Sequence, residues 1–149
     1  MSVRDKNMSV KTKWQGLLKE VLSKSRKGRV RAKVNAMEHD LTSSDLERMM
    51  KKQYSTCPYT SIPLRFTSSQ RAKAGDRKRF RNLSVDRILS SFGYTRDNVQ
   101  LVTKAAQKMK GELSPQEFIA ICRRIADVAD MKELPRMSEA DVDTLIDQF

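Results

Sequence analysis

The sequence predicts an α+β fold: one domain with helical extensions. Two short apolar segments, residues 83–88 and 99–102, have the composition of strands and lie on either side of a loop that turns at Gly93. A helix-forming segment over residues 105–110 follows and ends at Gly111. Segments with helical periodicity precede and follow this unit. We therefore expect a strand-loop-strand-helix unit with helices on both sides.

The N-terminal half predicts helices and a turn-rich connection. A basic helix is expected over residues 29–36. The pair Thr42 and Asp45 resembles a capping box at the start of another helix over residues 43–53. Residues 54–64 predict a knuckle-like hairpin, and residues 67–79 predict a loop. The first helix is expected over residues 11–25, where apolar residues recur at helical spacing: Trp14, Leu17, Leu18, Val21 and Leu22.

The C-terminal part predicts two more helices. Ser114, Pro115 and Glu117 form a strong helix start. Ser138 with Asp141 predicts the start of the last helix. We divide the chain into a basic helical extension (1–36), a central domain (37–130) and an acidic C-terminal helix (131–149). The apolar face expected after Ser114 consists of Phe118, Ile121, Cys122 and Ile125.

Charge is large and unevenly distributed. The 149 residues carry a formal net charge of +12, from 30 Lys and Arg against 18 Asp and Glu. Residues 1–36 contribute +9, residues 67–83 contribute +5, and residues 114–149 contribute −4. Such a balance favours a polyanionic partner, and nucleic acid is the first expectation. The basic zones are suited to phosphate contacts that position a duplex.

The sequence argues against a membrane-spanning helix and against a disulfide framework. No apolar run approaches the roughly 20 residues of a spanning helix, and no segment resembles a signal peptide. Cys57 and Cys122 stand alone, so neither a disulfide framework nor a four-cysteine zinc site is expected. We expect a protein of a reducing, cytoplasmic compartment.

Between residues 84 and 107 an acid, a base, a phenol and two amides are concentrated. Asp86 is an oxygen ligand at a strand end, and Gln107 offers an amide oxygen from the following helix, a set typical of a sparse Mg²⁺ or Mn²⁺ site. Arg87 is suited to clamping a phosphate. Tyr94 and Asn98 lie in and after the loop. On spacing alone a structural interpretation is favoured, with Asp86 and Arg87 as a surface ion pair.

The order of these motifs resembles the HNH endonuclease superfamily, in particular small phage proteins. The resemblance covers residues 40–126 through five segments: 40–42 (DLT), 57–64 (CPYTSIPL), 84–88 (SVDRI), 93–102 (GYTRDNVQLV) and 108–118 (KMKGELSPQEF). It implies a small ββα-metal core in a treble-clef-like frame. It also implies a metal-dependent DNA endonuclease, nicking one strand or cutting both.

The resemblance assigns roles residue by residue. Asp86 matches the metal-binding aspartate, Asn98 the asparagine that braces the active-site loop, and Gln107 falls at the last metal ligand. Arg87 stands where most members have the histidine base, and a guanidinium stays protonated, so Tyr94 is the candidate for proton transfer. Where relatives often have zinc-binding cysteines the chain has Thr60 and Thr103, so no structural zinc is expected.

These departures leave alternatives. The endonuclease is placed first, and an HNH frame that has lost its metal and binds DNA or a host or phage protein is the alternative. A purely protein-directed phage factor has no positive signal. The residues expected to contact double-stranded DNA are basic: Arg26, Lys27, Arg29, Arg31, Lys33, Arg71, Lys73, Arg77, Lys78, Arg79, Arg81, Arg96, Lys104, Lys108 and Lys110.

Overall fold

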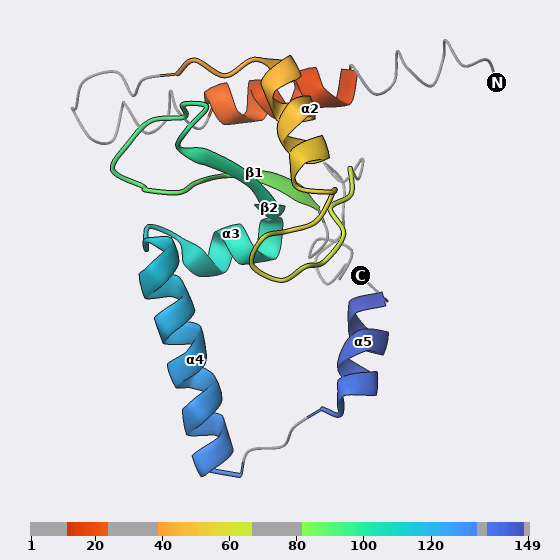
Figure 1. Cartoon of the computed structure of the whole chain (residues 1–149), viewed down its shortest axis with the longest axis vertical. Coiled ribbons are helices and arrows are strands. Elements are labelled where there is room, and N and C mark those ends of the chain that lie inside the picture. Colours follow the sequence, from red (N-terminus) through yellow and green to blue (C-terminus); the bar gives the residue numbers. More distant parts are fainter. Residues whose placement is uncertain (1–11, 24–38, 67–81, 134–136, 148–149) are drawn as a thin grey trace, which may run out of the picture.

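The structure, a computed structural model, describes residues 12–23, 39–66, 82–133 and 137–147. The predicted α+β class is confirmed. The predicted basic helix at 29–36 and loop at 67–79 lie outside the described residues. None of the described helices has the length and apolar content needed to cross a membrane. An N-terminal helix at 12–23 is followed by α2 (Ser43–Lys52), β1 (Leu83–Arg87), β2 (Val99–Thr103), α3 (Lys104–Lys110), α4 (Pro115–Met131) and α5 (Glu139–Asp147), as Figure 1 shows.

The sheet is an antiparallel pair between two helices. β1 and β2 pair from Leu83 opposite Thr103 to Arg87 opposite Val99. α2 contacts β2, while α3 contacts both strands, so the sheet separates the two helices (Figure 1). The Thr103 side chain caps α3 by accepting a hydrogen bond from the Ala106 amide, so the helix begins directly where β2 ends. The predicted strand-loop-strand-helix order is present.

The core joins the N-terminal helix and α2 to the sheet. Trp14 and Val21 of the N-terminal helix are buried, as its predicted apolar face requires. The Trp14 ring meets Phe66 edge to face, with centroids 4.4 Å apart. Leu46 of α2 and Leu101 of β2 are fully buried in the same cluster. The apolar faces of helix and strand therefore form one core.

Residues 54–64 form the predicted knuckle. Thr56 and Pro63 make an isolated antiparallel bridge, and the Cys57 amide donates to the Ile62 carbonyl at 2.9 Å. Ser61 turns the chain with a φ of 56°. Cys57 is buried and unbridged. The knuckle is thus held by backbone hydrogen bonds and core packing.

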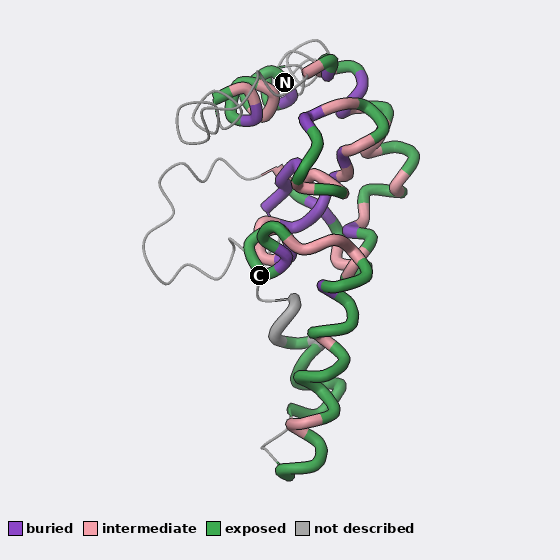
Figure 2. Tube along the Cα trace, turned by 90° about the vertical axis from the view of Figure 1, so that its left-hand side faces the viewer, coloured by how far each residue is buried: buried purple, intermediate pink, exposed green. Residues whose placement is uncertain are grey.

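α4 begins as predicted, but its predicted apolar face is not a core face. Ser114 and Glu117 form a capping box, and Phe118 is buried with its ring 5.3 Å from that of Tyr59. Beyond this first turn the helix extends away from the body (Figure 2). Ile121 and Ile125 are 47% and 64% exposed, and Cys122 is only partly buried. Of the predicted apolar face only Phe118 is buried, because α4 is attached mainly at its start.

The Thr42 and Asp45 capping box extends beyond α2. The Asp45 carboxylate accepts hydrogen bonds from the Thr42 amide at 3.0 Å and the Thr42 hydroxyl at 2.6 Å. Arg96, from the loop between the strands, places its Nε 3.2 Å from the same carboxylate. The Thr42 side chain is the main cause of a lowered Asp45 pKa, and Arg96 contributes. Asp45 thus links the start of α2 to the β1–β2 loop.

We predict that Asp45→Asn destabilises the protein by about 1 kcal/mol at neutral pH, the typical cost of a lost cap. A lowered pKa in the folded state means that the carboxylate stabilises the fold above its ordinary pKa of 3.8 and loses this effect as pH falls through the folded-state pKa. The difference from wild type should shrink below about pH 4 in urea titrations. Glu47→Gln, which removes only a surface pair with Lys51, is the control. A pH-independent difference would contradict the assignment.

Candidate functional site

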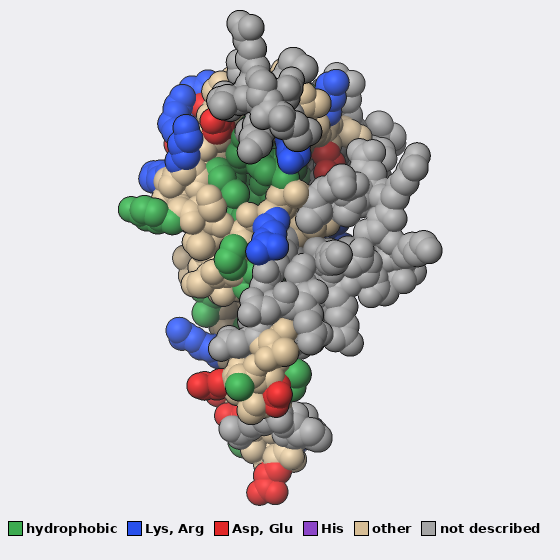
Figure 3. All heavy atoms as spheres, turned by 90° about the vertical axis from the view of Figure 1, so that its right-hand side faces the viewer, with side chains coloured by type: hydrophobic (Ala, Val, Ile, Leu, Met, Phe, Trp, Pro, Cys, Tyr) green, Lys and Arg blue, Asp and Glu red, His purple; other side chains and the backbone are tan. Residues whose placement is uncertain are grey.

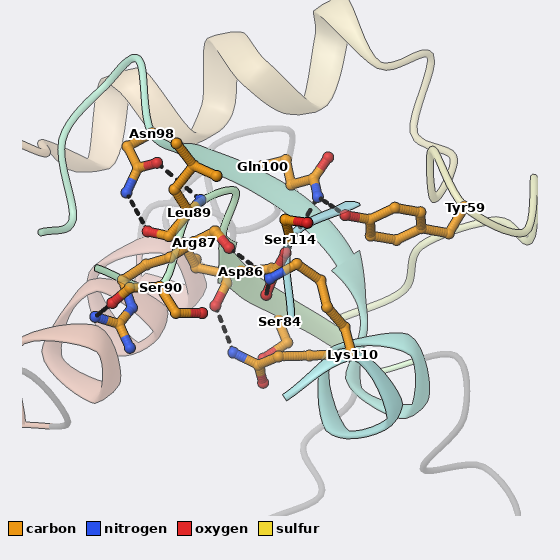
Figure 4. A network of polar contacts seen from close by, with 12 residues as sticks. Tyr59, Ser84, Asp86, Arg87, Leu89, Ser90, Asn98, Gln100, Lys110 and Ser114 are labelled. Atoms are coloured by element: carbon orange, nitrogen blue, oxygen red, sulfur yellow. Dashed lines mark hydrogen bonds and ion pairs between the residues drawn. The ribbon is translucent and has the colours of Figure 1, made fainter. Parts of the chain in front are cut away.

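Asn98 braces the loop between β1 and β2. Its Oδ1 accepts from the Leu89 amide at 3.0 Å, and its Nδ2 donates to the carbonyls of Leu89 at 3.0 Å and Gly93 at 2.9 Å. Figure 4 shows the amide facing Leu89 across the loop. This bracing geometry is the one that the HNH resemblance implies for Asn98.

Arg87 also holds this loop. Its Nη1 donates to the carbonyls of Ser90 at 2.7 Å and Phe92 at 3.2 Å. The guanidinium carbon lies 5.3 Å from the centroid of the Tyr94 ring, within the range of a cation–π contact. Tyr94 is 7% exposed. Arg87, the expected phosphate clamp, therefore packs against Tyr94, the expected proton-transfer group. Its Nη1 is directed to the loop backbone.

Asp86 is a buried carboxylate with both oxygens engaged. It is 3% exposed, its Oδ2 accepts from Gln100 Nε2 at 3.1 Å, and its Oδ1 lies 3.4 Å from Lys110 Nζ. Burial raises the pKa of Asp86, and the contacts with Gln100 and Lys110 partly counteract that rise. Figure 4 shows these groups converging between the sheet and α3.

Lys110 was expected on the DNA-facing surface, and the structure places it in the interior. It is 1% exposed, and its ammonium donates to the Arg87 carbonyl at 2.8 Å as well as facing Asp86. The position follows from helix geometry, because residues three apart share a face. Gln107 and Lys110 therefore both face β1, where Ser84 and Asp86 share a face of the strand.

Gln107 lies on the helix face that the metal hypothesis requires, but its amide has other partners. Its Oε1 accepts from the Ser84 hydroxyl at 2.6 Å, and its Nε2 donates to the Val85 carbonyl at 2.6 Å. The side chain thus fastens α3 to β1. The Gln107 Oε1 is engaged by Ser84, so it is not directed together with an Asp86 oxygen at one common ion position.

Two further members of this network were not among the predicted residues. Gln100, opposite Asp86 in the strand register, donates through Nε2 to Tyr59 Oη at 2.7 Å as well as to Asp86. Burial is the main cause of a raised Tyr59 pKa. The only sequence signal for Gln100 is its register opposite Asp86, which becomes visible once the loop length is known. Tyr59 has no local signal, because it comes from the distant knuckle.

The donor set does not fit the metal site that the resemblance implies. The described residues contain no group of three or more His, Cys, Asp or Glu residues placed to hold a metal ion. Asp86 and Gln107, the two predicted ligands, have their oxygens engaged by Lys110, Gln100 and Ser84. His39, the single histidine, pairs through its backbone with Tyr94, and its buried Nε2 has no hydrogen-bond partner in the described part of the chain.

The basic residues predicted to contact DNA fall into two groups. Of those in described segments, Arg96 is 56% exposed, Lys108 is exposed and Lys104 is partly buried. On the face drawn in Figure 3, Lys and Arg side chains gather mostly over the upper half, where some Asp and Glu side chains also lie, and further Asp and Glu side chains lie at the lower end. The second group of residues predicted to contact DNA lies outside the described residues: Arg26, Lys27, Arg29, Arg31, Lys33, Arg71, Lys73, Arg77, Lys78, Arg79 and Arg81.

Comparison with known proteins adds no assignment: no family model, curated protein or solved structure matches the chain.

We predict that Asn98→Ala lowers the free energy of unfolding by about 1–3 kcal/mol, because it removes three side-chain hydrogen bonds to the loop backbone, each worth about 1 kcal/mol net. Asn98→Asp should cost a similar amount, since a carboxylate cannot donate to the Leu89 and Gly93 carbonyls. Urea denaturation followed by circular dichroism measures both. Gln116→Ala, at an exposed position early in α4, is the control. Equal midpoints for Asn98→Ala and Gln116→Ala would contradict a bracing role.

Proposed function

We propose that the chain is a DNA-binding protein built on an HNH-like ββα unit. The motif order over residues 40–126 and the Asn98-braced loop between two antiparallel strands, followed at once by α3, support the HNH-like assignment. The engaged state of Asp86 and Gln107 favours binding over metal-dependent cleavage.

The observation that carries DNA binding is the separation of charge. Because residues 114–149 contribute −4 to a total of +12, residues 1–113 carry +16. α4 and α5 hold exposed acidic residues such as Asp127, Asp130 and Asp141. A phosphate backbone would bind the part that precedes α4 and avoid the acidic helices. Such contacts position a duplex without reading its sequence.

We predict that a fluorescein-labelled duplex binds at low ionic strength and that the logarithm of affinity falls linearly with the logarithm of salt concentration, at about −0.9 per neutralised phosphate. Fluorescence anisotropy measures both quantities. Lys108→Ala, at an exposed position of α3, should weaken binding and reduce the salt slope by about 1 if this side chain contacts phosphate.

Lys132→Ala, at the exposed end of α4, is the matched control and should leave the slope unchanged. Absent binding at low salt, or binding that salt does not weaken, would refute the DNA proposal.

A metal-dependent DNA endonuclease is the second candidate function. The observation that favours it is that Asp86 and Gln107 lie on facing elements, with the loop beside them braced by Asn98. This candidate predicts plasmid nicking with Mg²⁺ or Mn²⁺ that is lost in Asp86→Ala and strongly reduced in Tyr94→Phe. Circular dichroism of each variant controls for unfolding, because Asp86 is buried. Nicking that is independent of divalent metal, or absent with every metal tried, would exclude the candidate.

A further inference from the structure

Lys110 is a charged side chain in a place where charges are rarely found. It is 1% exposed, at the end of a seven-residue helix, and it reaches back toward the sheet. Burying an isolated ammonium is costly unless it is paired and hydrogen-bonded. Its Nζ meets both conditions through Asp86 Oδ1 at 3.4 Å and the Arg87 carbonyl at 2.8 Å.

The Lys110 ammonium lies between β1 and α3, the elements that carry Asp86 and Gln107, the two metal ligands that the HNH resemblance implies. Asp86 comes from β1, and Gln107 and Lys110 come from the α3 face that packs on β1. A divalent ion held there would neutralise the carboxylate in a desolvated space. Lys110 supplies positive charge to that same carboxylate.

We propose that the Lys110 ammonium replaces the divalent cation of this ββα unit and keeps metal ions away from Asp86. Three observations support the replacement. Asp86 has no oxygen left unpartnered, because Gln100 occupies Oδ2 and Lys110 faces Oδ1. A dication at Oδ1 would meet the ammonium at close range, where two positive charges repel strongly in a low dielectric.

The third observation is space. Mg²⁺ requires near-octahedral coordination and usually retains several water molecules. Asp86 is 3% exposed, and Lys110 is buried beside it, so a hydrated ion fits only if the lysine side chain leaves. If the Lys110 side chain left, its buried ion pair with Asp86 would be broken, and breaking a buried ion pair is costly.

Mn²⁺ binding to the purified full-length protein tests this proposal. Electron paramagnetic resonance counts free Mn²⁺ and so gives the bound stoichiometry. Any Mn²⁺ bound by acidic residues elsewhere, such as Glu139 and Asp141 of α5, would bind equally to wild type and to Asp86→Asn. We expect these two proteins to have the same stoichiometry. A bound ion that is present in wild type and lost in Asp86→Asn would overturn the proposal.

Removing the lysine should open the site. Lys110→Ala should gain a Mn²⁺ ion that wild type does not bind, and saturating Mn²⁺ should raise its Tm by roughly several degrees, as expected for a ligand that binds only the folded state. Adding Asp86→Asn to this variant should abolish both effects. A folded Lys110→Ala protein that gains no Asp86-dependent Mn²⁺ would overturn the proposal.

A second variant guards against loss of folding. Asp86→Asn combined with Lys110→Met removes both charges at nearly constant volume, a change that buried ion pairs often tolerate. This protein should fold and bind no more Mn²⁺ than wild type. If wild type instead binds an additional Mn²⁺ ion that this double variant lacks, the proposal fails. DNA affinity is measured separately by anisotropy, so failure of the DNA proposal and failure of the metal replacement are distinguishable.

Discussion

The structure depends on one buried ion pair, between Asp86 of β1 and Lys110 of α3. Both residues are nearly inaccessible to solvent, so each needs the other and the polar groups around it. The pair orients α3 on the sheet, with Gln107 adding hydrogen bonds to Ser84 and Val85. Gln100 and Tyr59 extend the network to the knuckle, which in turn meets α4 through Phe118. Within the described residues this network connects the sheet and α3 to the knuckle and to α4.

The same network gives structural partners to the residues to which the HNH resemblance assigns chemistry. Asn98 and Arg87 direct their hydrogen bonds to backbone carbonyls of the loop. Tyr94 is buried beneath the Arg87 guanidinium. A loop held this firmly suits a scaffold that presents basic residues to a phosphate backbone. It suits less well a catalytic loop in which the base and the metal ligands must remain accessible.

Local rules predicted the framework well. The capping pairs Thr42 with Asp45 and Ser114 with Glu117 define helix starts by hydrogen bonds within four residues, so the sequence determines them directly. The strands and Gly111 are likewise local signals. Periodicity predicted an apolar face on α4, but periodicity does not show whether a partner covers such a face. Ile125, on this face, is exposed in the structure.

The site was predictable only in part. Asp86, Asn98 and Gln107 were identified from motif order, but their partners depend on distances between elements. Lys110 sits in the last turn of a helix, where an exposed lysine that interacts with the helix dipole is the ordinary expectation. Its burial follows from how closely α3 packs on β1, and no single segment contains that information.

Diffraction from crystals grown with Mn²⁺, measured where manganese scatters anomalously, shows whether Lys110 takes the place of a metal ion. We expect no anomalous peak between Asp86 and Gln107, with the Lys110 ammonium in contact with the Asp86 carboxylate. A peak at ligand distance from an Asp86 oxygen, with Lys110 turned away, would contradict it.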